Sequence, residues 1–296
     1  MTLAEIEAIN AETRRKLAAA VGDPAALAAG SFPYYGYVEV EFPDCPRLVM
    51  FTNNDAPGVA SAMQGIFEPT SVKLWARLCR STTGVLDIGA NVGIYSLCAA
   101  RLRPDLQVHA FEPNPYAFAR LRMHKVINTL ANIVEHPAAI GPENGMTGFG
   151  WAVKPGGNIA SGGGFSGYGK AHWEKILVQV MRLDGSGIAQ TLGARPLVKI
   201  DVEGAEMVVF ESMKETLALR PDIILETFTA EACQVINAQM LPLGYRVYLI
   251  DEKGGVLLPR ERLMPAELDA HGNFNQLLTT RPASEIDALM TTGLRG

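Results

Sequence analysis

The sequence predicts an α/β fold: a seven-stranded, mostly parallel, doubly wound sheet with an N-terminal cap before it. Two observations carry this prediction. From Gly84 onward, short apolar runs alternate with helical patterns, which is typical of βαβ units. The first of these runs ends in a turn with two glycines that opens directly into a helix, an arrangement that open parallel sheets use at ligand sites.

The first 67 residues (1–67) are expected to form the cap, and residues 68–296 the main domain. The segment Thr2-Leu-Ala-Glu5 matches a capping box, and apolar residues then recur at helical spacing to about Val21. Residues 32–51 are rich in aromatic and β-branched side chains punctuated by prolines, which predicts short strands in an irregular cap. This region is expected to border the substrate.

Helical and strand patterns then alternate along the chain. A helix is expected over residues 69–80, ahead of the first strand. The predicted strands are residues 84–88, 107–111, 133–136, 197–201, 223–226, 246–250 and 276–279. The helices predicted between them are residues 93–103, 115–128, 205–219 and 230–241.

Residues 141–169 interrupt this alternation. They contain 11 of the 29 glycines, including the runs 156–157 and 162–164, so a regular helix or strand throughout is disfavoured. Long loops inside a domain are usually lids or linkers, and a lid is expected here. Its extended flanks are predicted at residues 148–153 and 177–181.

Composition and charge disfavour several classes of protein. The net charge is −5 and the longest basic run is Arg14-Arg15-Lys16, which gives a nucleic-acid partner little electrostatic support. No uninterrupted apolar stretch is long enough for a membrane span, and the first residues lack the pattern of a secretory signal. The four cysteines lie far apart without a C-x-x-C pair, so a reducing, cytoplasmic environment is expected.

The turn at residues 85–93 predicts a ligand site at the end of the first strand. Gly89 would let the backbone turn tightly and approach a ligand, and Gly93 would allow close helix packing. Glu112 ends the next strand, 25 residues after Asp87, where a carboxylate can hydrogen-bond both hydroxyls of a ribose. Together these features predict a ligand that contains adenosine.

The identity of that ligand depends on the residues of the turn. A dinucleotide fingerprint needs G-x-G-x-x-G, but Asn91 occupies the middle glycine position. Asp87 would repel a pyrophosphate, whereas it would attract an ammonium or a sulfonium centre. S-Adenosylmethionine carries both cations and is the predicted cofactor, while an NAD-binding oxidoreductase remains the alternative.

Three longer motifs carry a resemblance to a known family: Leu86-Asp-Ile-Gly-Ala-Asn-Val-Gly-Ile-Tyr-Ser96, Phe111-Glu-Pro-Asn114 and Val198-Lys-Ile-Asp-Val-Glu-Gly-Ala-Glu206. They resemble the FkbM-family methyltransferases, over about residues 68–280. Three shorter elements extend the resemblance: Arg182-Leu-Asp184, Leu225-Glu226 and Gly272-Asn-Phe-Asn275. The resemblance implies a Rossmann-like class I methyltransferase that uses S-adenosylmethionine, mainly to methylate hydroxyls of sugars or natural products. The loop at 141–169 departs from the family pattern because it is richer in glycine.

The resemblance also implies which residues bind the cofactor. The glycine turn from Asp87 to Gly93 would surround the methionine part, and Glu112 would bind the ribose. Pro113 and Asn114 would flank the adenine, which backbone groups near Ala138 would also approach. The cofactor-binding residues predicted in this way are Glu68, Asp87, Gly89, Ala90, Asn91, Gly93, Glu112, Pro113, Asn114 and Ala138.

Three further residues are predicted to act on the methyl acceptor. Lys199 and Asp201 are two apart on one strand, so their side chains share a face, and Asp201 falls at its carboxyl end. Asp201 is the predicted base that takes the hydroxyl proton, although it could instead orient the acceptor or cap the next helix. Glu203 could bind the acceptor or Lys199, whereas a place at the helix N-terminus explains Glu206.

A metal site is not predicted. Asp201 and Glu226 would end neighbouring strands, an arrangement that resembles the metal pair of catechol O-methyltransferases, but Thr227 stands where a carboxamide is expected. The five histidines show no spacing typical of a zinc site.

The acceptor is expected to be a small molecule or a glycan. No nucleic-acid partner and no membrane span are expected. The walls of the acceptor site are predicted to be aromatic, although these side chains could also be packing residues: Tyr34, Tyr35, Tyr37, Phe165, Tyr168 and Trp173. N-methylation, a nucleic-acid acceptor and a non-catalytic binding module remain open as alternatives. The sequence predicts no oligomeric state.

Overall fold

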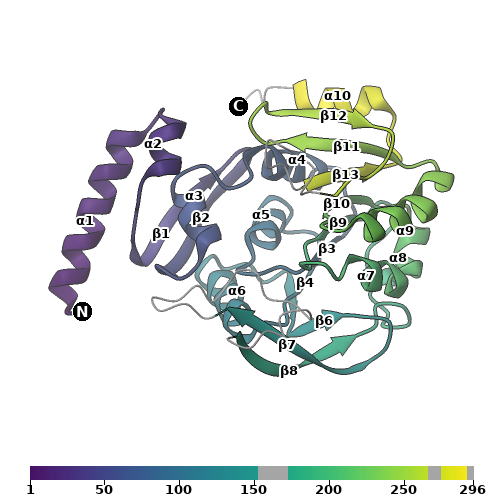
Figure 1. Ribbon diagram of the computed structural model, residues 1–296, viewed down its shortest axis with the longest axis horizontal. Coiled ribbons are helices and arrows are strands. Elements are labelled where there is room, and N and C mark those ends of the chain that lie inside the picture. Colours follow the sequence, from purple (N-terminus) through teal and green to yellow (C-terminus); the bar gives the residue numbers. More distant parts are fainter. Residues whose placement is uncertain (153–172, 266–274, 292–296) are drawn as a thin grey trace.

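The computed structural model describes residues 1–152, 173–265 and 275–291 (Figure 1). In these residues the chain forms one eight-stranded sheet, one three-stranded sheet and one two-stranded hairpin. Helices pack on both faces of the large sheet, as the sequence predicts for a doubly wound α/β fold. None of the described helices is both long and apolar enough to cross a membrane.

The large sheet has the strand order β12-β11-β13-β10-β9-β3-β4-β5. Five consecutive strands of this order are parallel: β3 (Val85–Ile88), β4 (Val108–Phe111), β5 (Ile133–His136), β9 (Leu197–Ile200) and β10 (Asp222–Glu226). The other three strands are β11 (Arg246–Asp251), β12 (Val256–Arg260) and β13 (Asn275–Thr279). Strand β13 runs antiparallel to both β10 and β11. Strand order reverses at β3, which lies between β4 and β9.

All seven predicted strands are confirmed, and β12 is an eighth that the sequence did not predict. This strand pairs only with β11 within the described sheet, and most of its side chains are exposed. Its apolar run ends after Leu258 and is shorter than the about four to eight residues typical of a buried strand. Its Pro259 also argues against a central position, because proline cannot donate a hydrogen bond to a neighbouring strand.

The predicted helices are confirmed, with one difference. They are α4 (Pro69–Cys79), α5 (Ile94–Leu102), α6 (Pro115–Ile127) and α9 (Ala230–Met240). Helix α10 (Ala283–Thr291), after the last strand, was not predicted. The helix predicted over 205–219 is divided into α7 (Glu206–Ser212) and α8 (Lys214–Ala218). The backbone carbonyl of Ser212 accepts a hydrogen bond from the backbone amide of Asp184 at 2.8 Å. The Ser212 hydroxyl accepts one from the backbone amide of Leu183. These bonds to another segment coincide with the break, where Met213 has φ −120°.

Side chains alternate between two hydrophobic clusters, one on each face of the large sheet. Along β3, Val85 packs in the cluster with α4 and α5, whereas Leu86 and Ile88 pack in the cluster with α7 and α9. Because side chains alternate along a strand, Asp87 and Lys199 point to the same face as Val85, beneath α5. The alternation therefore buries two charged side chains opposite one another.

The N-terminal region is more regular than the sequence predicts. It contains α1 (Leu3–Ala20), α2 (Pro24–Ala29), the hairpin strands β1 (Tyr35–Phe42) and β2 (Cys45–Asn53), and α3 (Pro57–Met63). The predicted capping box is confirmed, since Thr2 and Glu5 each accept the other's backbone amide. Helix α1 lies at the outer edge of the molecule (Figure 1) and contacts the segment around β1 through Asn10 and Thr13.

The hairpin is joined to the rest of the chain by both apolar and polar contacts. Leu48 and Met50 are fully buried in the cluster that includes α4 and α5. On α6, His124 accepts the backbone amide of Phe51 at 2.8 Å. Asn128 caps α6, and its side chain makes two hydrogen bonds to the backbone of Val49. It accepts one from the Val49 amide at 2.9 Å and donates one to the Val49 carbonyl at 2.6 Å. His124 and Asn128 thus provide hydrogen-bond partners for backbone groups of β2.

The three-stranded sheet occupies part of the region predicted as a lid. Its strands are β6 (Ala138–Ile140), β7 (Gly145–Ala152) and β8 (Trp173–Met181), in the order β6-β8-β7. The described residues of the predicted extended flanks fall in β7 and β8, which pair antiparallel. Phe149 and Trp151 alternate with glycines in β7 and are buried on one face, so this part is a strand and not a loop. Residues 153–169 of the predicted lid lie outside the described residues.

We expect the substitution Asn128→Ala to lower the free energy of unfolding by roughly 1–3 kcal/mol, because it leaves the amide and carbonyl of Val49 without partners. Denaturation by guanidinium measures this value. Val126→Ala on the same helix is the control: its side chain is 74% exposed, and the expected change is within about 0.5 kcal/mol. Equal small effects of the two substitutions would show that this contact does not hold the hairpin.

Candidate active site

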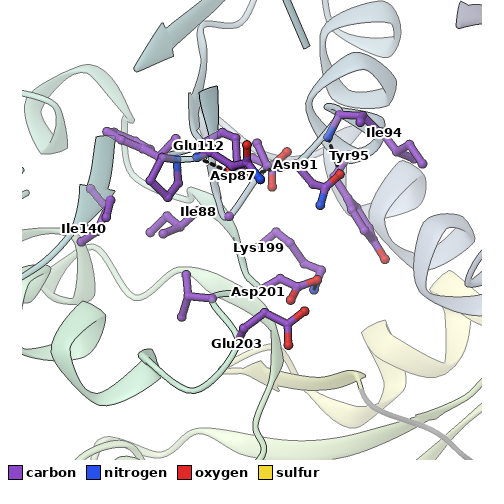
Figure 2. Close-up of a pocket in the computed structure, with 18 of the residues that line it drawn as sticks. Asp87, Ile88, Asn91, Ile94, Tyr95, Glu112, Ile140, Lys199, Asp201 and Glu203 are labelled. Carbon is purple, nitrogen blue, oxygen red and sulfur yellow. Dashed lines mark hydrogen bonds and ion pairs between the residues drawn. The ribbon is translucent and has the colours of Figure 1, made fainter. Parts of the chain in front are cut away.

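A cavity of about 220 Å³ lies at the carboxyl ends of β3, β4 and β9, where strand order reverses (Figure 2). Open α/β sheets bind ligands outside the carboxyl ends of their strands at such a point. The structure brings all but one of the predicted site residues to its wall: Glu68, Asp87, Gly89, Ala90, Asn91, Glu112, Pro113, Asn114, Ala138, Lys199, Asp201 and Glu203. The exception is Gly93.

Two glycines shape the turn after β3, in different ways. Gly89 has φ +83°, and a Cβ atom there would lie 1.7 Å from the carbonyl oxygen of Asp201, so only glycine fits. Gly93 begins α5 with φ +94°, and a Cβ atom would lie 3.1 Å from the side chain of Leu121. This contact agrees with the part in helix packing expected of Gly93, which does not line the cavity.

Glu112 connects the two loops that border the cavity. Its carboxylate accepts the backbone amides of Asn91 at 2.8 Å and Asn114 at 2.7 Å. Burial raises the pKa of Glu112 to about 7, although these two donors oppose the shift. A carboxylate has about four lone-pair sites, so it can also accept hydroxyl donors of a ligand.

Asp87 lies deep in the wall and is 1% exposed. Its carboxylate accepts the hydroxyl of Ser96 on α5 at 2.5 Å. Burial raises the pKa of Asp87 to about 6, against the opposing effects of Ser96 and the Lys199 ammonium. Asp87 and Glu112 therefore both titrate close to neutral pH.

Lys199 is a buried cation of the site, with 1% of its side chain exposed. Its ammonium lies 2.9 Å from Oδ1 of Asn275, 3.4 Å from Oδ2 of Asp201 and 5.3 Å from the centre of the Tyr95 ring. Burial lowers the pKa of Lys199, but the carboxylates of Asp201 and Glu68 help to outweigh that effect, and the pKa is raised. Lys199 thus stays protonated at neutral pH.

Glu68 precedes α4 in a left-handed conformation, with φ +37°. Its Oε2 atom accepts the hydroxyl of Tyr95 at 2.5 Å and the side-chain amide of Asn275 at 2.8 Å. These bonds join the N-terminus of α4 to α5 and β13. The acidic residue predicted upstream of the first strand therefore reaches the cavity wall.

Asp201 and Glu203 follow Lys199 along one wall of the cavity (Figure 2). The side chain of Asp201 is 29% exposed, so it is open to a second molecule, unlike Lys199. Glu203 is exposed and has φ +53°. Glu206 is fully buried and accepts the amide of Gly204 at 2.8 Å, which gives it a structural role at the start of α7.

Negative charge dominates the described part of the wall. It contains one ammonium, from Lys199, and five carboxylates, from Glu68, Asp87, Glu112, Asp201 and Glu203. A cleft lined by one sign of charge concentrates ligands of the other sign. The site is therefore suited to a cationic ligand.

A family model described as "Methyltransferase FkbM domain" matches residues 87–247, more than half of the chain. The chain belongs to the FkbM methyltransferase family. The match begins at Asp87 in the glycine turn and contains most of the cavity wall. The resemblance noted in the sequence is confirmed, and membership of a methyltransferase family supports S-adenosylmethionine as the cofactor.

Individual relatives of this FkbM-family protein match it only in part. The protein "31-O-demethyl-FK506 methyltransferase FkbM" of Streptomyces tacrolimicus is 42% identical over 62 residues, 21% of this chain and 24% of that protein. "Methyltransferase 1" of Beauveria bassiana (strain ARSEF 2860) is 24% identical over 145 residues, 44% of this chain and 58% of that protein. The chain thus spans about a quarter and a little over half of the length of these two curated relatives.

A solved S-adenosylmethionine-dependent methyltransferase from Agrobacterium tumefaciens is a more distant likeness. It is 10% identical, with a TM-score of 0.44, and the match covers 85% of this chain and 73% of that one. A likeness this distant does not bear on the reaction.

The structure adds residues that the sequence did not assign to the site. Phe67, Tyr95 and Phe149 line the cavity, and Asn275 contacts two residues of its wall. Tyr95 belongs to the first family motif, but only its bond to Glu68 reveals a role. The resemblance at the closing strand was the available signal for Asn275.

The predicted aromatic walls are corrected in part. Tyr34, Tyr35 and Tyr37 do not line the cavity. Tyr34 accepts a hydrogen bond from Arg14 at 2.9 Å, and Tyr37 packs edge-on against Phe51. Aromatic content predicted the hairpin but not the face on which its side chains lie. Phe165, Tyr168 and the side chain of Trp173 lie outside the described part of the chain.

The residues considered as a metal pair are Asp201 and Glu226, and residue 227 is a threonine where such a pair would be followed by a carboxamide. Thr227 is fully buried, and its hydroxyl accepts the amide of Gln276 at 3.1 Å. Burial and the Asp201 carboxylate raise the pKa of Glu226 to about 9. Within the described ranges, no three acidic, histidine or cysteine side chains are grouped as metal ligands.

We expect Gly89→Ala to abolish cofactor binding and to lower the free energy of unfolding by at least about 3 kcal/mol, because the new Cβ would overlap the carbonyl of Asp201. Calorimetric titration and denaturation measure the two effects. Gly185→Ala is a matched control: Gly185 has φ +80° but open space around it, so only the conformational cost of about 1–2 kcal/mol applies. Similar losses in the two variants would contradict the steric explanation.

The affinity for S-adenosylmethionine is expected to fall several-fold as the pH drops through about 7. Below that value Glu112 gains a proton, and it loses both negative charge and an acceptor site for ribose hydroxyls. Titration calorimetry between about pH 5.5 and 8 tests this. In Glu112→Gln the step near pH 7 should disappear and binding should be about tenfold weaker, leaving only the dependence of Asp87 near pH 6. A step that persists in this variant would assign it to another group.

Proposed function

We propose that this FkbM-family protein transfers a methyl group from S-adenosylmethionine to a hydroxyl of a sugar, a glycan or a small natural product. One observation carries the proposal. The glycine turn, the buried Glu112 and the open Asp201 carboxylate line one cavity, at the point where strand order reverses. A nucleoside cofactor and a hydroxyl acceptor can therefore meet in that cavity.

The described residues fit the proposed cofactor in charge and in hydrogen bonding. S-Adenosylmethionine supplies an electrophilic methyl group on a sulfonium centre and also carries an ammonium. We assign Glu112 to the ribose hydroxyls, and the turn from Asp87 to Asn91, with Glu68, to the methionine part. Pro113, Asn114 and Ala138 are assigned to the adenine, in keeping with the family resemblance. The excess of carboxylates in the wall favours a cation there.

Asp201 is the proposed general base. It is the partly exposed carboxylate next to the buried ammonium of Lys199, whose Nζ lies 3.4 Å from its Oδ2. A fixed carboxylate can take the proton of an acceptor hydroxyl while that oxygen attacks the methyl group. Lys199 keeps the carboxylate oriented, and Glu203, on the same wall, is assigned to acceptor binding. The remaining rate enhancement is assigned to positioning of the acceptor oxygen in line with the methyl group.

The acceptor class is supported by the name of one relative. The protein of Streptomyces tacrolimicus is named for methylation at an oxygen of FK506, and its match to this chain covers 24% of its length. Transfer to oxygen is therefore preferred to transfer to nitrogen. The four cysteines are free, in keeping with the proposed cytoplasmic location.

The test is a screen of hydroxyl acceptors with S-adenosylmethionine labelled at the methyl carbon. With a productive acceptor, Asp201→Asn is expected to lower the rate of methyl transfer by about 100-fold or more, the usual contribution of a general base. Cofactor affinity should change less than about threefold. Glu211→Gln, an exposed carboxylate on α7, is the control and should leave both values unchanged.

Two results would overturn parts of this proposal. If Asp201→Asn transfers methyl groups at the wild-type rate, Asp201 is not the base. If calorimetry shows tight binding of NAD and none of S-adenosylmethionine, the protein is not a methyltransferase.

A further inference from the structure

We propose that Asn275, at the start of β13, is a positioning residue that holds the Lys199 ammonium toward Asp201 and separates it from the Glu68 carboxylate. The inference rests on the proposed function, since it concerns the wall on which Asp201 would act. Asn275 is 2% exposed and does not line the cavity. It therefore acts through Lys199 and Glu68 and not on a ligand.

The two ends of the Asn275 amide contact residues of opposite charge. Its Oδ1 atom accepts a hydrogen bond from the Lys199 ammonium at 2.9 Å, and its Nδ2 atom donates one to Glu68 Oε2 at 2.8 Å. An ammonium can only donate, and an ionised carboxylate can only accept. The neighbours thus fix the orientation of the amide, and a flipped amide would lose both bonds.

This amide bridges two side chains of opposite charge. Lys199 and Glu68 form no direct ion pair, and the one ion pair of Lys199 is with Asp201, within the described chain. Besides Asp201, the acidic side chains of Glu68, Glu226 and Asp87 interact electrostatically with the Lys199 ammonium. A neutral bridge on one side leaves Asp201 as the carboxylate that the ammonium approaches most closely. The bridge therefore decides which acidic residue Lys199 orients.

The fold explains why residue 275 can reach this place. Strand β13 runs antiparallel to β10, with Asn275 opposite Glu226, so its first residue lies at the carboxyl edge of the parallel strands. The next residue, Gln276, points to the other face and donates to Thr227 and to the carbonyl of Met264. Two neighbouring buried amides thus serve different faces of one strand.

Gln276 provides a matched control for Asn275. Both are 2% exposed, both are on β13, and both side chains make buried hydrogen bonds. The substitutions Asn275→Leu and Gln276→Met each replace an amide by an apolar group of similar size. Both should lower thermal stability, but only the first removes an acceptor from Lys199.

The first readout needs no cofactor. Titration of lysines labelled with ¹³C at Cε, followed by NMR, reports the pKa of Lys199. We expect Asn275→Leu to lower it by about one pH unit or more, because the buried ammonium loses its nearest acceptor. Gln276→Met should leave it unchanged. Asn275→Asp, which keeps the shape and the acceptor, should leave it unchanged or raise it, and serves if the leucine variant does not fold.

The second readout is the rate of a single methyl transfer with a saturating acceptor. Asn275→Leu should lower this rate at least about tenfold, while Gln276→Met stays within about twofold of the wild type. An unchanged Lys199 pKa in Asn275→Leu, or equal changes in the Gln276 variant, would overturn the positioning role. Altered Lys199 titration in a protein that transfers no methyl group would instead uphold the role of Asn275 and reject the proposed function.

Discussion

A buried ammonium balances the acidic side chains of the cavity wall. Lys199 lies beside Asp87 in the sheet register, 3.4 Å from Asp201 and within reach of the Tyr95 ring. Without this cation, the neighbouring carboxyl groups would be buried with no compensating charge, which is costly in a medium of low dielectric constant. The position of Lys199 follows from strand alternation, because every second residue of β9 faces α5. The electrostatics of the site thus begin with the pairing of β3 and β9.

The charged forms of the buried carboxyl groups favour binding of a cation but lower the stability of the fold. Burial raises the pKa of Asp87 and Glu112 above their ordinary values, to about 6 and about 7. Their contribution to stability is therefore complete below the pKa of the unfolded chain and is lost as the pH rises through the folded values. The charged forms that a cation would select are the forms that the fold tolerates least. Sites selected for function often retain such a cost.

Most of the fold could be predicted from the sequence because the central strands are buried on both faces. Their apolar runs, with helices between them, specify parallel strands without knowledge of contacts. The edge strand β12 has an apolar run of only three residues, and the break at Ser212 coincides with a carbonyl bonded by another segment. Those two features are set by tertiary neighbours. The local periodicity of the sequence therefore does not predict them.

The candidate site divides in the same way. The turn residues and Glu112 belong to short motifs at strand ends, so their convergence follows from the topology. Asn275 and Tyr95 join the site through side chains from distant elements, and no spacing in the sequence encodes their bonds to Glu68. The tyrosines of the hairpin region do not line the cavity, because aromatic content does not give the direction of a side chain. Sequence motifs identified the turn, whereas the network around Lys199 required the folded chain.

The bond between Glu68 and Asn275 also has a consequence for how the protein is made. These residues are 207 positions apart, and the last central strand enters the sheet between β10 and β11, which precede it along the chain. During synthesis, the ribosome releases the glycine turn, Glu112 and Lys199 long before Asn275. Contacts of such large sequence separation form slowly, because a long loop must close first. In the nascent chain, Lys199 and Glu68 would therefore lack the Asn275 amide that bridges them until β13 docks.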